Sequence, residues 1–272
     1  MLRVLKRTGM LLFLALTVIV FGACKKENTE QLSDSTEESV AASTELVSSD
    51  ALLENSIQNQ FYQMLQTETD REPLYTFFEE NVSALNQTDT DSFVLGLIGF
   101  EDDSSKADYN RLKPYTDNMS MEMANFVSIM SHEQDTPSLD GRGSRVPLED
   151  LLKNCRTLES HLSEYPDGIT IKYGYNLYAD LMTAAITGGY DEVSAVDNQY
   201  LSDDRKHIDG KAIEAYNAFI SENPDSKTAV ILKKYLDALD NSKKTIDDEI
   251  KNFYADIYGT IKEEYGNTLK IN

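Results

Sequence analysis

The sequence is poor in the residues that most often carry cross-links or chemistry. It has two cysteines, three histidines and no tryptophan in 272 residues. Two cysteines exclude a disulfide-stapled fold and a multi-cysteine zinc or iron–sulfur site. Basic residues are also scarce, because 25 Lys and Arg stand against 47 Asp and Glu and give a formal net charge of −22. Since nucleic acids bind mainly through Lys and Arg, this imbalance argues against a nucleic-acid partner.

The sequence does have enough apolar residues for a folded domain. Hydrophobic residues make up 40% of the chain and charged residues 26%. These fractions exclude a disordered acidic tail and a protein with many membrane spans. The length suits one or two domains with a buried core.

The N-terminus has the pattern of a signal peptide. Arg3, Lys6 and Arg7 form a positive region before a run over 10–21 that is apolar except for Thr17. That run has the length of a signal-peptide core and is too short to cross a bilayer comfortably. The pattern therefore predicts export from the cytoplasm.

The end of this segment, Phe-Gly-Ala-Cys over 21–24, resembles the lipobox of bacterial lipoproteins. The resemblance implies that 1–23 is removed and that Cys24 is acylated, which would anchor the protein to a bacterial membrane, facing outside the cytoplasm. A plain signal peptide and an uncleaved anchor are the alternatives. The segment 24–49 is rich in Ser, Thr and Glu and has no aromatic residue. We expect a disordered tether there, with a short helix over 37–46 as the alternative.

Helical periodicity dominates the remaining chain, 50–272. Apolar residues recur at spacings of three and four, and no long stretch alternates with a period of two. We therefore predict an all-α domain, and we expect no cofactor. The expected helices cover 50–67, 71–86, 90–100, 105–114, 117–133, 147–164, 169–187, 209–222, 226–240 and 243–266.

Cys155 lies in one of these expected helices. Leu151, Leu158 and Leu162 flank it at the spacings of an apolar stripe. If Cys24 carries lipid, Cys155 has no cysteine to pair with. We expect a buried and unreactive thiol, with a reactive nucleophile as the alternative.

A pseudo-repeat with an offset of 58 residues relates 147–187 to 209–240. Ser-Glu-Tyr-Pro-Asp-Gly over 163–168 corresponds to Ser-Glu-Asn-Pro-Asp-Ser over 221–226. At the same offset Cys155, Leu158, Leu162, Leu177, Tyr178 and Leu181 match Ile213, Tyr216, Ile220, Tyr235, Leu236 and Leu239. Each copy is predicted to be two helices joined by a tight Pro-Asp turn.

The second copy resembles the tetratricopeptide-like, helical-hairpin lipoproteins. Ala212, Tyr216, Pro224 and Ala229 follow their pattern of an alanine, an aromatic residue, a Pro-Asp-Ser turn and a further alanine. The offset of 58 residues differs from that family's period of about 34. The resemblance implies an irregular solenoid of stacked antiparallel helical hairpins with a concave surface for protein or peptide partners.

Patterns typical of metal binding and catalysis are weak. The sequence has no HExxH, GxSxG, P-loop or EF-hand pattern. His132 follows a methionine-rich stretch that contains Met119, Met121 and Met123, which are residue types that hold soft metals. Met121 points away from the face that Met119 and Met123 share, so core packing is favoured and no metal site is expected.

Five residues are the candidate binding residues. Tyr173, Tyr175 and Tyr190 lie around the first repeat, and aromatic rings with hydroxyls suit a peptide- or sugar-binding groove. Arg142 and Arg145 lie in a glycine-containing loop and are expected to orient an anionic group. An exposed connector and simple helix packing are the alternatives.

Three functions are compatible with these features. The first is a membrane-anchored helical scaffold that binds an envelope protein or peptide and is not an enzyme. The second is a substrate-capturing lipoprotein that binds a solute or glycan for a transporter. The third is a hydrolase that uses carboxylates such as Glu149 and Asp150, which any acidic protein offers. The first is favoured by the repeat and the tether.

Overall fold

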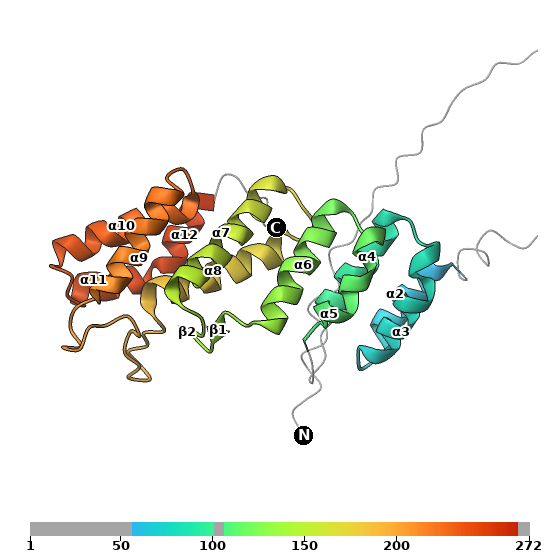
Figure 1. Ribbon diagram of the computed structural model, residues 1–272. Helices are drawn as coiled ribbons and strands as arrows, with labels where there is room; N and C mark the ends of the chain where they lie inside the picture. The colour runs from blue at the N-terminus through green and yellow to red at the C-terminus, as the bar shows by residue number, and fades with distance from the viewer. Residues whose placement is uncertain (1–55, 101–105, 266–272) are drawn as a thin grey trace, which may run out of the picture. The chain divides into compact units, whose positions relative to one another are not determined.

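The computed structural model describes residues 56–100 and 106–265, which form helices and one short hairpin (Figure 1). The hairpin strands, β1 (Leu139–Asp140) and β2 (Gly143–Ser144), pair antiparallel. The helices are α2 (Ile57–Thr67), α3 (Glu72–Asn81), α4 (Gln87–Gly99), α5 (Tyr109–Leu112), α6 (Met121–Asp135), α7 (Leu148–Glu164), α8 (Ile171–Thr187), α9 (Gly210–Glu222), α10 (Lys227–Asn241), α11 (Asp248–Ala255) and α12 (Ile257–Tyr265), with 3-10 turns at Val82–Ala84 and Lys113–Asn118. The predicted all-α class is therefore confirmed.

Several predictions lie outside the described residues. These are the signal peptide over 1–23, the acylation of Cys24, the tether over 24–49 and the start of the first helix at residue 50. They stay predictions.

Five predicted helices have clearly different boundaries. Helix α4 starts at Gln87 instead of residue 90, and α6 covers Met121–Asp135 instead of 117–133. The helix expected over 71–86 ends at Asn81 and continues as a 3-10 turn. The helix expected over 105–114 has a single α-helical turn, α5, because Pro114 has no N–H to donate and the chain continues as a 3-10 turn. The helix expected over 243–266 starts at Asp248, since Lys243 and Lys244 have left-handed φ angles of 52° and 60°, and it is interrupted at Asp256.

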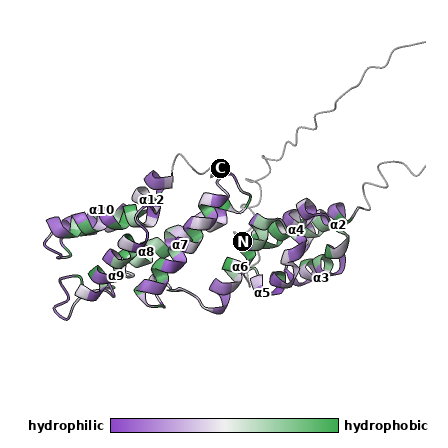
Figure 2. Cartoon of the chain, turned by 45° about the horizontal axis from the view of Figure 1, so that its top comes forward, coloured by the Kyte–Doolittle hydropathy of each residue, from purple (hydrophilic) through white to green (hydrophobic). Residues whose placement is uncertain are grey.

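Two hydrophobic clusters stabilise the described chain. One is built from α2 to α6 and includes Phe61, Phe78, Phe93 and Phe126. The other is built from α7 to α12. Hydrophobic and hydrophilic positions alternate along the helices in Figure 2, as expected when one side of each helix is buried. Helix α6 packs against α7, and the clusters meet there, where the Phe126 and His161 rings lie 5.8 Å apart.

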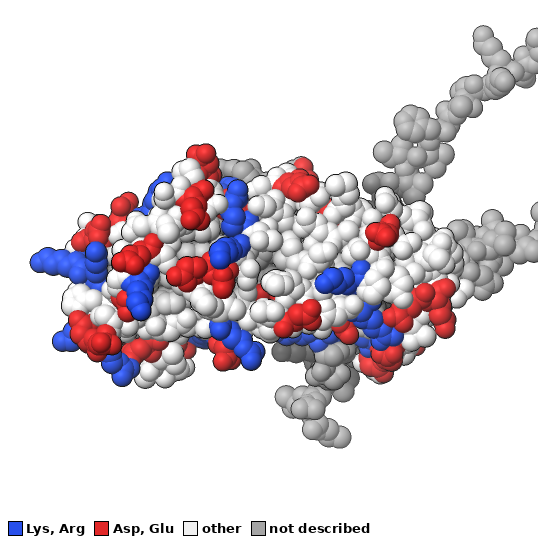
Figure 3. Space-filling view, viewed as in Figure 1, with Lys and Arg blue, Asp and Glu red and all other residues white. Residues whose placement is uncertain are grey.

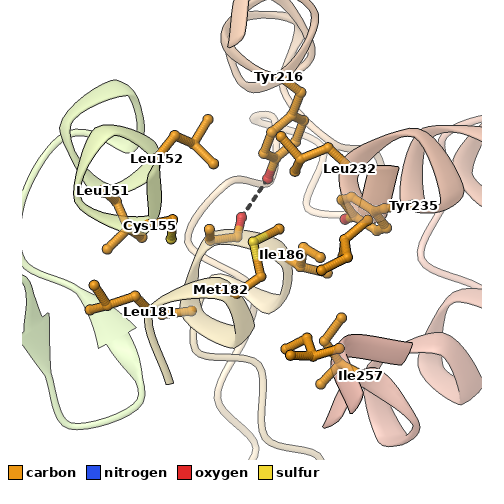
Figure 4. Close-up of a cluster of buried hydrophobic side chains, with 14 of the residues drawn as sticks. Leu151, Leu152, Cys155, Leu181, Met182, Ile186, Tyr216, Leu232, Tyr235 and Ile257 are labelled. Carbon is orange, nitrogen blue, oxygen red and sulfur yellow. Dashed lines mark hydrogen bonds between the residues drawn. The ribbon is translucent and has the colours of Figure 1, made fainter. Parts of the chain in front are cut away.

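The second cluster joins both copies of the repeat. Cys155 of α7, Met182 of α8, Tyr216 of α9 and Leu232 of α10 converge in Figure 4, and all four are buried. The Tyr216 hydroxyl donates to the Ala185 carbonyl at 2.7 Å, so the phenol is buried without losing its hydrogen bond. The predicted burial of Cys155 is confirmed, and burial raises the pKa of its thiol.

The 58-residue offset holds in the turns between the helices. The Gly168 N–H donates to the Tyr165 carbonyl at 3.0 Å, and the Ser226 N–H donates to the Asn223 carbonyl at 3.1 Å. Both are hydrogen-bonded β-turns with proline at the second position, which suits the fixed φ of proline. Helix α7 packs against α8, and α9 packs against α10, across these turns. The predicted pair of helical hairpins is therefore confirmed.

The packing of the second copy is less complete. All six matched positions of the first copy are buried except Leu177, which is half-buried. In the second copy Ile213, Ile220 and Leu236 are only half-buried. For Ile213 and Ile220 the difference follows from position, because α7 packs against α6, α8, α9 and α10, whereas the main contacts of α9 are with α7 and α10.

A glutamate from an earlier helix caps the second helix of each hairpin. The Thr170 N–H and hydroxyl both donate to Glu122 Oε1 at 2.7 Å. At the equivalent position the Thr228 N–H and hydroxyl donate to Glu159 Oε2 at 3.1 and 2.8 Å. Free N–H groups at the start of a helix favour an acidic partner. These carboxylates therefore tie successive helical units together.

Within the described ranges, no helix combines the length and the apolar character that a membrane crossing requires.

Candidate binding cleft

The structure separates the three candidate tyrosines. Tyr173 packs in the first cluster, with its ring centre 6.3 Å from that of Phe126. Tyr175 packs against the second cluster, edge-to-face with Tyr265 at 5.8 Å. Tyr190 follows the end of α8 and lies 5.5 Å from the ring of Tyr254. All three are half-buried, and they do not share one surface.

The two candidate arginines also differ in their surroundings. Arg142 lies in the turn between β1 and β2, and its Nη1 pairs with Asp191 at 2.5 Å. Arg145 is exposed after β2, and its backbone N–H donates to the Ser138 carbonyl at 2.8 Å. Of the five candidate residues, only Arg142 and Tyr190 line the same cleft.

This cleft, called the Arg142–Tyr190 cleft below, has a volume of about 610 Å³. That volume lies within the usual range for ligand-binding pockets. The walls are the β1–β2 turn, the second half of α8 with the loop that follows, and the α11–α12 junction. Its polar and aromatic lining includes Arg142, Asp180, Tyr190, Asp191, Tyr254 and Tyr258.

Two glycines shape the loop that follows α8. Gly188 ends the helix with a left-handed φ of 55°, and Gly189 has a φ of 79°. A Cβ on Gly189 would lie 2.9 Å from the Gly143 Cα, so the hairpin packs directly on this turn. The buried Asn198 side chain fixes the far side of the loop, because its amide donates to the Tyr254 hydroxyl at 2.8 Å. The cleft therefore stands on a tightly packed support.

Ion pairs balance part of the charge in the cleft. Asp191 accepts from the Ser194 hydroxyl at 2.9 Å, from backbone N–H groups and from Arg142. These contacts hold the pKa of Asp191 below its usual value, and the hydrogen bond from the Ser194 hydroxyl has the largest effect. The Lys251 Nζ atom lies 3.7 Å from Glu192 Oε1. Among the described residues, Asp180 accepts a hydrogen bond from the Tyr258 hydroxyl alone, at 2.7 Å.

The aromatic residues in the cleft have different roles. Tyr254 belongs to the core, since its hydroxyl bonds Asn198 and Tyr235, and burial raises its pKa to about 12. Tyr258 is 52% exposed. Burial has the largest effect in raising the pKa of Tyr258, and the hydrogen bond to Asp180 raises this pKa further. Tyr258 therefore supplies the accessible ring surface of the cleft, and Tyr190 extends it.

A second groove, of about 590 Å³, lies between α6, α7 and α8. The half-buried Ile129 and Leu177 contribute apolar surface, and Asn125 and His132 lie among its polar residues. Met119 and Met123 are buried and Met121 is 78% exposed, as the core-packing prediction requires. Across the described part of the chain, no three His, Cys, Asp or Glu side chains are grouped closely enough to hold a metal ion.

Sequence reasoning missed Asp180, Tyr258 and the capping carboxylates Glu122 and Glu159. Asp180 and Tyr258 are 78 residues apart, and neither stands in a motif. For Glu122 and Glu159 the sequence held one indication. The threonines that they cap, Thr170 and Thr228, are also separated by the 58-residue offset.

Comparison with known proteins yielded no matching protein family, no matching curated protein and no matching solved structure.

Proposed function

We propose that this protein is a lipid-anchored, extracytoplasmic scaffold that binds a protein or peptide of the cell envelope. The observation that carries the proposal is the Arg142–Tyr190 cleft, where exposed aromatic surface and charged groups meet on a well-packed support. Aromatic rings bury a large area at little cost in side-chain entropy and are common at the centre of protein interfaces.

We further propose that the two hairpins form an irregular tetratricopeptide-like solenoid. Equivalent proline turns, equivalent buried threonines and their glutamate caps support this relation between the copies. In such an array each hairpin buries its apolar face on its neighbour, which leaves the remaining surfaces and the connecting loops free for binding.

The test is photo-crosslinking on intact cells of the native host. A photoreactive amino acid is placed at Val193, which lines the cleft and is 96% exposed. Met121, 78% exposed and outside the lining of the cleft, is the matched control. We expect a discrete cross-linked product at Val193 that is absent at Met121 and reduced when Tyr258→Ala is added. Equal products at both positions, or none at Val193, would contradict a partner at this cleft.

A further inference from the structure

We propose that the Arg142–Tyr190 cleft receives a positively charged side chain, the lysine or arginine of a basic peptide segment. This inference rests on the proposed scaffold function and names the chemistry of its partner. It is carried by Asp180, by the exposed ring of Tyr258 and by the balance of charges around them.

Asp180 carries a negative charge that no ion pair balances in the described part of the chain. It is exposed on α8, and no Lys or Arg pairs with it within the described residues. Its hydrogen bond from the Tyr258 hydroxyl leaves further lone pairs available, because an ionised carboxylate accepts about four hydrogen bonds. A lysine ammonium or an arginine guanidinium would donate to these positions and balance the charge.

The Tyr258 ring stands beside this carboxylate and is fixed by the same hydrogen bond. The face of an aromatic ring is the negative part of its quadrupole, so it attracts a cation placed over it. The alkyl stem of lysine or arginine also gains from apolar contact, and the exposed Ala255 lines the same cleft. The carboxylate and the ring face therefore suit the charged group of a lysine or arginine, and the apolar lining suits its alkyl stem.

The other charges in the cleft make an anionic ligand a poor fit. Arg142 is held by Asp191, and Lys251 lies beside Glu192. Asp180, Asp191 and Glu192 thus outnumber the two cations by one. The whole chain carries −22, which attracts basic partners at long range and repels acidic ones.

The experiment measures binding of tetralysine and tetraglutamine peptides to the purified chain that starts at residue 25, by isothermal titration calorimetry at physiological salt. We expect tetralysine to bind and tetraglutamine not to bind. Asp180→Asn should weaken tetralysine binding on the order of tenfold, since it removes a charge-assisted contact. Tyr258→Leu should weaken it by about threefold and Tyr258→Phe by less, because phenylalanine keeps the ring.

The control is Asp237→Asn, which removes one exposed carboxylate from α10, outside the cleft lining. If it weakens binding as much as Asp180→Asn does, the peptide binds to the overall negative field and the inference is wrong. Failure of tetralysine to bind, or equal binding of tetraglutamine, also overturns it. A cross-linked partner at Val193 together with no tetralysine binding would leave the scaffold proposal standing and refute only the cationic ligand.

Discussion

At the scale of single residues, His161 is the most unusual titratable group. It is 2% exposed, and its Nε2 lies 2.9 Å from the Thr170 hydroxyl. Because that hydroxyl donates its proton to Glu122, the ring must donate through Nε2–H and carries no proton on Nδ1. Nδ1 is buried and has no hydrogen-bond partner among residues 56–100 and 106–265. Burial lowers the pKa of His161 below its ordinary value of 6.5, although Glu122 and Glu164 partly oppose the shift.

The first prediction is a loss of stability in mild acid that depends on His161. When the folded pKa lies below the unfolded pKa, the unfolded chain binds the proton first, so stability is complete above about pH 6.5 and falls as the pH decreases below it. The slope is at most about 1.4 kcal/mol per pH unit. Urea denaturation between pH 8 and 5.5 measures it.

His161→Phe should remove this slope, because phenylalanine cannot be protonated. The second repeat supports the choice, since Phe219 occupies the equivalent position and is buried. The matched control is His132→Gln, at an exposed histidine on α6, which should leave the slope unchanged. An unchanged slope in His161→Phe would show that other groups cause the acid sensitivity.

At the scale of elements, the contact between hairpins depends on Glu159. The side chain is 3% exposed, accepts hydrogen bonds from Lys227 and Thr228 at the start of α10, and pairs with Arg156 at 3.1 Å. Thr228 is also buried, and its hydroxyl lies 3.0 Å from that of Tyr178. Loss of the carboxylate would leave several buried donors without an acceptor, which is costly.

We predict that Glu159→Ala lowers the free energy of unfolding by about 3 kcal/mol and that Glu159→Gln lowers it by about 1 to 2 kcal/mol, because glutamine keeps one acceptor oxygen. Equilibrium urea unfolding at neutral pH measures both. Glu214→Ala removes an exposed glutamate of α9 and should change the free energy by less than about 0.5 kcal/mol. A similar small change for Glu159→Ala would mean that the capping contact does not join the hairpins.

At the scale of the whole molecule, the distribution of charge bears on the proposed binding. Acidic and basic side chains are interspersed over the face shown in Figure 3, so the net charge of −22 is not gathered there in one patch. An excess of negative charge that is spread in this way steers basic partners without by itself fixing a binding site. In the proposed binding mode, selectivity comes from local groups, such as the pair of Asp180 and Tyr258.

The prediction at this scale concerns the lipid. Cys24→Ala should abolish the incorporation of a fatty-acid analogue and release the protein from the membrane fraction, because the acyl chains supply the membrane affinity. Cys155→Ala is the control, since its buried thiol should not be acylated and labelling should persist. Metabolic labelling followed by fractionation measures both. Retained label in Cys24→Ala would refute the lipoprotein assignment.

Particular residues show how far the sequence could lead. The proline turns at Pro166 and Pro224 and the burial of Cys155 were predictable, because spacing along one helix and turn chemistry are local properties. The joint site for Tyr173, Tyr175 and Tyr190 was not predictable in this way. Residues 173 and 175 lie on different sides of α8, and they pack against different clusters.

The sequence by itself determined the helical elements, most of their ends and the repeated hairpin, since these depend on periodicity, capping and turns over a few residues. Only the tertiary structure decided which side chains meet. Arg142 and Asp191 are 49 residues apart, Thr228 and Glu159 are 69, and Tyr258 and Asp180 are 78. Such contacts depend on the packing of whole helices, and no local pattern records them.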